Sequence, residues 1–143
     1  MRNEADSKSK LVYIASPYAA PNDGEVDQNK WFARMACRYC IEQGHTPIAV
    51  HLLYTQILDD SDPVQREAGL RLGRHVLWSC DELWVCGDRI SSGMAAEIEQ
   101  ATQLGIPMET VSAGQILNAP EPVYAIWAKG RPEGPLAGQS GFL

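Results

Sequence analysis

The stretch ELWVCGDRISSGMAAEIEQATQLGIPMETV, residues 82–111, contains the pattern that decides the fold. It begins with a short apolar run rich in β-forming residues and passes through a polar turn. It then continues as a helix whose apolar residues have core spacing. Leu104-Gly105 ends this helix, and a second apolar run extends from Ile106 to Val111. A strand, a helix and another strand in this order predict a βαβ crossover between parallel strands.

The same alternation occurs in the first half of the chain. The predicted strands are 11–15, 46–50, 82–86 and 106–111, and the predicted helices are 25–43, 62–79 and 91–104. Gly44 is expected to end the first helix in a left-handed conformation. Asp62 and Pro63 are typical of a helix start, and the helix that follows is expected to turn Leu72 toward the core.

Length and composition are those of one globular domain, with 143 residues, 45% hydrophobic and 21% charged. We expect a flexible leader over residues 1–9 and an α/β domain over 10–116. A Gly/Pro-rich segment follows over 117–143, in which Val123–Trp127 would add an edge strand. The predicted fold class is α/β, doubly wound, flavodoxin-like or Rossmann-like, with a mainly parallel sheet of four to five strands.

Charge and hydropathy exclude several classes of partner. The net charge of −6 disfavours a nucleic acid polymer or an anionic membrane as the main partner. No apolar run is long enough to span a bilayer, and the first ten residues lack the apolar core of a signal peptide, so a cytoplasmic location is expected. No G-x-G-x-x-G follows the first strand, which disfavours a dinucleotide-binding oxidoreductase.

Four cysteines occur at Cys37, Cys40, Cys80 and Cys86. The Cys37-x-x-Cys40 spacing is compatible with a redox pair or half of a zinc site, but it lies inside a helical stretch, and the second pair lacks zinc-ribbon spacing. Buried free thiols are therefore the favoured interpretation, and no metal site or cofactor is predicted.

Polar residues follow three of the predicted strands at their carboxyl ends, where open parallel sheets bind ligands. These candidate site residues are Tyr13, Ser16, Tyr18, His51, Asp88, Ser91, Ser92, Gly93 and Met94. The Ser91-Ser92-Gly93 turn opens a helix, whose free N–H groups and dipole suit an anionic group such as phosphate. The alternative is that Ser91 or Ser92 only caps the helix.

Glu97 lies one turn beyond this helix start, beside the core-facing stripe. A carboxylate at the edge of an apolar crevice can act as a nucleophile or an acid. The alternative is an ordinary helix-surface glutamate. Tyr13, in the middle of a strand, is likewise compatible with simple packing.

Four blocks resemble the nucleoside 2-deoxyribosyltransferase-like superfamily, in its small bacterial and phage branch. They are Val12-Tyr-Ile-Ala-Ser-Pro-Tyr18, Cys80-Asp-Glu-Leu-Trp-Val85, Ser91-Ser-Gly-Met-Ala-Ala-Glu97 and Gly105-Ile-Pro107. The resemblance covers roughly residues 10–111. It implies cleavage or exchange of the N-glycosidic bond of a nucleoside or nucleotide.

The resemblance also implies roles for individual residues. Glu97 matches the glutamate that attacks C1′ of the sugar, and Tyr13 matches the tyrosine that orients it. Ser91 occupies the place of an aspartate in the transferases proper, and of a serine that binds the 5′-phosphate in the related deoxynucleoside monophosphate hydrolases. A further family aspartate falls near Gly73, and no carboxylate replaces it.

Two functions follow as hypotheses. The first is an enzyme that hydrolyses or transfers the N-glycosidic bond of a nucleotide or nucleoside through Glu97. The second is a module that binds or senses nucleotides on the same fold without turnover. The expected partner is a small-molecule nucleoside or nucleotide. A homo-oligomer is also expected from the resemblance, with Val123–Trp127 as one contact segment.

Overall fold

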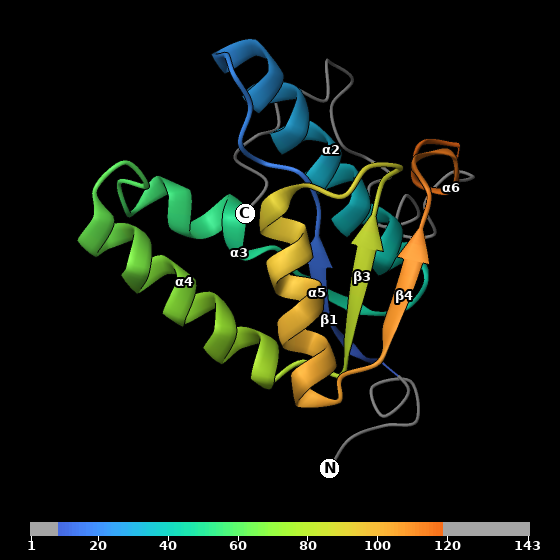
Figure 1. The fold of residues 1–143 in the computed structure, drawn as a ribbon. Helices are drawn as coiled ribbons and strands as arrows, with labels where there is room; N and C mark the ends of the chain where they lie inside the picture. The colour runs from blue at the N-terminus through green and yellow to red at the C-terminus, as the bar shows by residue number, and fades with distance from the viewer. Residues whose placement is uncertain (1–8, 119–143) are drawn as a thin grey trace, which may run out of the picture.

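A computed structural model of the protein describes residues 9–118 (Figure 1). Of the predicted leader, only Ser9 belongs to these residues. The predicted edge strand Val123–Trp127 lies outside them. Within the described range one sheet has four strands, all parallel, in the order β2-β1-β3-β4. The strands are β1 (Leu11–Ala15), β2 (Thr46–Ile48), β3 (Glu82–Cys86) and β4 (Met108–Val111).

Helices cover both faces of this sheet (Figure 1). They are α2 (Asp23–Glu42), α3 (Val50–Leu53), the 3₁₀ turn η1 (Tyr54–Gln56), α4 (Pro63–Trp78), α5 (Ser92–Leu104) and α6 (Ala113–Leu117). The helices α2 and α6 pack on one face, and α3, α4 and α5 pack on the other. The fold is therefore doubly wound and Rossmann-like, which confirms the predicted class.

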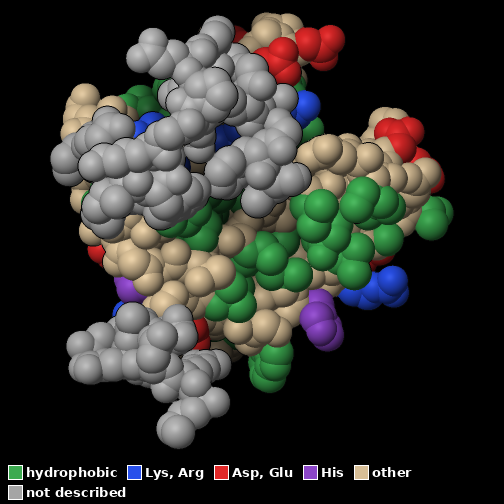
Figure 2. Space-filling model, turned by 180° about the vertical axis from the view of Figure 1, so that it is seen from behind, with side chains coloured by type: hydrophobic (Ala, Val, Ile, Leu, Met, Phe, Trp, Pro, Cys, Tyr) green, Lys and Arg blue, Asp and Glu red, His purple; other side chains and the backbone are tan. Residues whose placement is uncertain are grey.

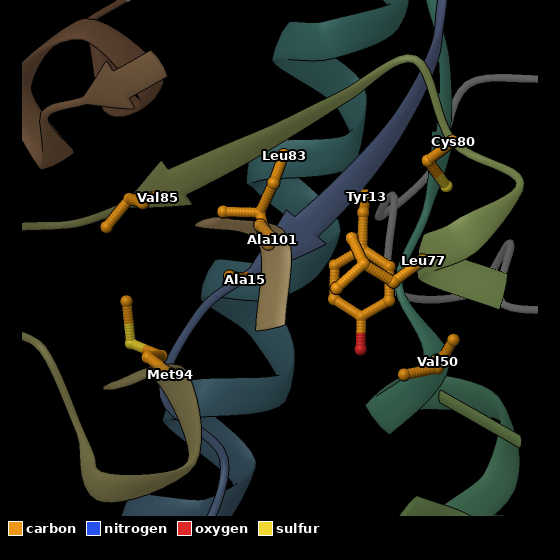
Figure 3. Packing of buried hydrophobic residues seen from close by; sticks show 9 residues of the cluster. All are labelled: Tyr13, Ala15, Val50, Leu77, Cys80, Leu83, Val85, Met94 and Ala101. Atoms are coloured by element: carbon orange, nitrogen blue, oxygen red, sulfur yellow. The ribbon is translucent and has the colours of Figure 1, made fainter. Parts of the chain in front are cut away.

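Successive residues of β1 point to opposite faces of the sheet. Val12 and Ile14 join the apolar cluster under α2 and α6, and Tyr13 and Ala15 join the cluster under α3, α4 and α5. Figure 3 shows the second cluster, in which the Tyr13 ring lies beside Leu77. All four residues are 2% exposed or less, so β1 forms the centre of both cores.

Local signals in the sequence set most helix ends. The side chains of Asn22, Asp62 and Ser91 accept hydrogen bonds from backbone N–H groups of α2, α4 and α5. Gly44 and Gly105 follow α2 and α5 with φ of 89° and 71°, the left-handed conformation that glycine adopts without strain. The ends predicted at Asp62 and Gly44 are thus confirmed.

Several details differ from the expectations. The fourth strand begins at Met108 rather than Ile106. Leu72 is 38% exposed, because Gly73 and Leu77 face the core instead. The second strand ends at Ile48 rather than Val50, because Val50 begins α3 and packs in the cluster that contains Tyr13. The short helix α6 was not predicted.

The four cysteines are free; Cys40, Cys80 and Cys86 are buried and Cys37 is half-buried, which confirms the interpretation as thiols in the core. Burial raises the pKa of Cys37 to about 11 and that of Cys86 to about 12. These thiols therefore stay protonated near neutral pH, where only a thiolate would react or bind metal.

On the face of the molecule shown in Figure 2, hydrophobic side chains gather on the side where α3 and α4 lie. The large exposed hydrophobic residues of α3, α4 and the segment between them are Leu53, Ile57, Val64, Leu70, Leu72 and Trp78. No helix within residues 9–118 has both the length and the apolar character needed to cross a membrane.

Candidate active site

The order of the strands determines where a ligand can bind. The chain passes from β1 to β2 on one side and then returns to place β3 on the other side of β1. In parallel sheets a crevice opens at such a reversal, outside the carboxyl ends of the two central strands. Ser16 and Tyr18 follow β1 at this edge, and the turn that leads into α5 follows β3.

Tyr13 and Glu97 meet at the α5 side of the sheet, although 84 residues separate them in the sequence. The Tyr13 hydroxyl donates a hydrogen bond to Oε2 of Glu97. In Figure 3 this hydroxyl points away from Leu83 and Cys80, toward the side where Val50 and Met94 lie. The structure thus brings together the two residues predicted to be catalytic, while their catalytic role stays a prediction.

Burial gives both partners unusual protonation behaviour. Desolvation raises the pKa of Glu97 to about 7, although the hydrogen bond from Tyr13 acts in the opposite direction. Desolvation, together with the negative charge of Glu97, raises the pKa of Tyr13 far above its usual value. Tyr13 therefore remains a hydrogen-bond donor at any physiological pH, and Glu97 exchanges its proton near neutrality.

Ser16, Tyr18 and His51 form a second polar group at the same edge. Ser16 Oγ lies 2.9 Å from His51 Nε2, and the Tyr18 ring meets the imidazole edge-on, with 6.0 Å between ring centroids. Burial lowers the pKa of His51 to about 4, so the imidazole is neutral near pH 7. A neutral imidazole and a hydroxyl can bind polar substituents of a ligand without adding charge.

The turn predicted to bind an anion forms the start of α5. Ser91 Oγ accepts a hydrogen bond from Met94 N at 3.2 Å, so Ser91 caps the helix, as the simpler alternative required. The first hydrogen bond within α5 is donated by Ala95 N, to Ser91 O, so the N–H groups of Ser92 and Gly93 are free of intrahelical partners. Both residues are exposed. Capping by Ser91 therefore leaves two backbone donors of this turn for an anion.

Two predicted site residues make contacts within the protein. The Met94 side chain is 1% exposed and packs in the core, so it does not line an open site in this conformation (Figure 3). Asp88 is exposed, and its Oδ1 accepts a hydrogen bond from Ala113 N at 3.1 Å, at the start of α6. A carboxylate at a helix N-terminus stabilises that helix.

Gly73, near which the resemblance places a family aspartate, lies next to Tyr13. A Cβ added to Gly73 would lie 3.6 Å from the Tyr13 hydroxyl oxygen and 3.8 Å from Cγ2 of Val50. The backbone of α4 therefore lies close to the Tyr13 hydroxyl, with room for a methyl group between them. Sequence reasoning did not foresee this contact between Gly73 and Tyr13.

The described residues contain no group of three or more His, Cys, Asp or Glu that could hold a metal ion. The site brings together a carboxyl group that titrates near neutrality, a phenol that donates to it, and a neutral imidazole.

Fold and site together define a doubly wound α/β protein with a candidate ligand site at the carboxyl ends of β1 and β3. The chain belongs to the family described as "Domain of unknown function (DUF7768)", whose model matches residues 10–111. No curated protein matches it.

Among solved structures, a 2-deoxyribosyltransferase from the psychrotolerant bacterium Bacillus psychrosaccharolyticus is similar, with a TM-score of 0.56 and 20% sequence identity. The match covers 71% of this chain and 72% of that one. That enzyme is described as a biocatalyst for the synthesis of antiviral and antitumoral nucleosides. At this level of identity the likeness concerns the fold alone.

Proposed function

We propose that the protein cleaves or transfers the N-glycosidic bond of a nucleotide or nucleoside, with Glu97 as the nucleophile. The hydrogen bond between Tyr13 and Glu97, beside the sheet edge where ligands bind, carries the proposal. Tyr13 occupies Oε2 of the carboxylate, which leaves Oε1 to attack a sugar carbon. Because the bond also fixes the carboxylate, it provides the orientation that covalent catalysis requires.

A nucleoside 5′-monophosphate is the substrate class that we favour. The free N–H groups of Ser92 and Gly93 lie at the positive end of a 13-residue helix, which attracts phosphate. Glu97 is on the same helix, a little more than one turn further on. A phosphate at the start of α5 would therefore direct the attached sugar toward Glu97.

The proposed reaction has two steps. An oxygen of ionised Glu97 attacks C1′ and forms an ester, while the C1′–N bond breaks and its electron pair stays on the base nitrogen. The departing base takes up a proton from solvent. Water then attacks C1′ of the ester, loses a proton to solvent and restores the Glu97 carboxylate. A second base in place of water would give transfer instead of hydrolysis.

A nucleotide-binding module without turnover is the second candidate, and Gly73 favours it. The family aspartate expected near this position would face Tyr13, but Gly73 has no side chain there. One acid or base group typically contributes about 10²- to 10⁴-fold to a rate. A chain that lacks it would turn over slowly or only bind.

Base release from a panel of deoxynucleosides, ribonucleosides and their 5′-monophosphates separates the two candidates. We expect free base from the wild-type chain, detected by chromatography, and a loss of at least about 10³-fold in Glu97→Gln, which keeps the hydrogen bond but removes the nucleophile. Glu99→Gln is the matched control, because Glu99 is an exposed glutamate on the same helix.

The control should release base at close to the wild-type rate. Equal rates in Glu97→Gln and the wild type would exclude Glu97 as the nucleophile. Saturable nucleotide binding without base release, unchanged in Glu97→Gln, would favour the binding module. Thermal unfolding of each variant checks that the fold is kept.

The homo-oligomer and the cytoplasmic location also remain proposals. Val123–Trp127, the segment expected to make the subunit contact, lies outside the described residues. The exposed apolar residues Leu53, Ile57 and Leu70 support self-association, because such a surface is costly in water. Light scattering after size-exclusion chromatography would measure the assembly directly.

A further inference from the structure

A groove of about 330 Å³ lies between the outer sides of α4 and α5, apart from the residues of the candidate active site. From α4, Arg71, Arg74, His75 and Trp78 line it. Arg74 and His75 lie three and four residues after Arg71, and Trp78 lies four and three residues after them, so the four residues form a single stripe along the helix. The groove lies toward the carboxyl-terminal ends of α4 and α5, away from the Ser91 turn at the start of α5.

The α5 side of the groove is uncharged and consists of the amide side chains of Gln100 and Gln103 and the apolar side chain of Leu104. No carboxylate is among the described residues that line the groove. Three cationic or titratable basic side chains thus share one small surface of a chain whose net charge is −6. This arrangement attracts a small anion.

Stabilisation of the helix end does not account for these basic residues. Cations interact with the helix dipole only within about the last turn. His75 belongs to the last turn of α4, which ends at Trp78, but Arg71 lies two turns before that end. Arg74 makes one contact with a carboxylate, at 3.6 Å from Glu67, and both side chains are exposed, so this ion pair is weak.

Trp78 adds an aromatic surface to the charged one. Its side chain is 69% exposed to solvent and lines the same groove as the guanidinium groups of Arg71 and Arg74. An indole face can stack on a flat ring, and amide groups such as those of Gln100 and Gln103 can bond to the ring edge. The groove volume lies near the lower end of the range of small-molecule sites.

We infer that this groove is a second ligand site, which binds a small anion that carries a flat ring, of the nucleoside monophosphate class. The guanidinium of Arg71 binds the phosphate, and Trp78 stacks on the base. This inference goes beyond the proposed function and does not depend on it, because neither residue takes part in the chemistry at Glu97.

The indole N–H signal of Trp78, assigned by its loss in Trp78→Phe, provides a local readout in a two-dimensional NMR titration with AMP. We expect a saturable shift of this signal and no shift for Trp31, an exposed tryptophan on α2. In Arg71→Gln the dissociation constant read from Trp78 should rise about tenfold or more, the usual effect of losing a charged hydrogen bond.

Arg66→Gln is the matched control, since Arg66 is an exposed arginine of α4 outside the groove, paired with Asp60. Its dissociation constant should stay within about twofold of wild type, as is usual for surface substitutions. Adenosine and inorganic phosphate should each bind at least about tenfold more weakly than AMP, because each lacks one half of the contact. An unmoved Trp78 signal, equal effects of the two arginine variants, or phosphate binding as tightly as AMP would overturn the inference.

Because the readout belongs to Trp78 alone, it is independent of binding at the active site. A chain that releases no base from any nucleotide would refute the proposed function and leave this site standing. Conversely, a catalytically active chain whose Trp78 signal ignores AMP would refute only the second site.

Discussion

The two faces of β1 differ in what they bury. Val12 and Ile14 face a cluster made of aliphatic residues, thiols and one indole, under α2 and α6. Tyr13, between them in the sequence, faces the opposite side, where its hydroxyl donates a hydrogen bond to the half-buried carboxyl group of Glu97 on α5. The same strand therefore supplies a purely structural core on one face and the candidate active site on the other.

The two clusters also differ in the ionisable groups that they bury. On the α2 side the buried groups that could ionise are thiols, and burial keeps them protonated, with the pKa of Cys86 raised to about 12. On the α5 side the pKa of Glu97 is about 7. A substitution on the α2 face should therefore alter stability, and one on the α5 face should alter pH dependence as well.

The largest effect is expected for Ile14→Ala, which removes a fully buried side chain from the α2 face. We expect the free energy of unfolding to fall by about 3 kcal/mol, because the variant loses apolar burial and gains a cavity. Urea unfolding at several pH values measures it. The loss should be the same at every pH, and a loss that changes across pH 7 would mean that the two faces are coupled.

A comparable effect concerns the contribution of Glu97 to the pH dependence of stability. Its pKa is about 7 in the folded chain against 4.5 for an ordinary glutamate, so the folded state binds more protons between these values. Stability from this group is complete below pH 4.5 and is lost as pH rises through 7, about 3 kcal/mol in all. Relative to wild type, Glu97→Gln should therefore gain stability between pH 5 and pH 8.

His51 should show the opposite sign and so serves as the internal comparison. Its pKa is lowered to about 4 by burial, which means that the unfolded chain takes up a proton first as pH falls. Stability from His51 is present above pH 6.5 and is lost toward pH 4. If the free energies of unfolding of Glu97→Gln and of the wild type change with pH in parallel, Glu97 does not have the raised pKa on which this contrast depends.

Much of the fold followed from the sequence, because its signals are local. The apolar runs gave β1 and β3, and Asp62, Gly44 and Gly105 marked the helix ends where the structure has them. The short helix α6 was missed although Ser112 and Gln115 form a capping box, a signal present in the sequence but not used.

The site followed less directly. Spacing alone left Glu97 as either a surface glutamate or a site residue, and only the resemblance paired it with Tyr13. Contacts between distant segments were not predictable from local pattern. Leu72 was expected in the core but is exposed. This error depends on how α4 is rotated against the sheet, which periodicity alone does not determine.

The smallest expected effect comes from the two glycines inside α4, Gly69 and Gly73. Comparing them separates an effect on the stability of α4 from an effect on the candidate active site. Gly73 lies against Tyr13, whereas a Cβ at Gly69 would meet only Leu58, at 3.4 Å. Replacement of either by alanine should stabilise the chain by about 0.5–1 kcal/mol, because glycine is the poorer helix former and neither new methyl group clashes. Only Gly73→Ala places that methyl group beside the Tyr13 hydroxyl, so only this variant should lower base release. Equal effects of Gly69→Ala and Gly73→Ala on base release would show that α4 acts on the site through its stability. Destabilisation by Gly73→Ala would show that α4 packs more tightly on Tyr13 than the structure indicates.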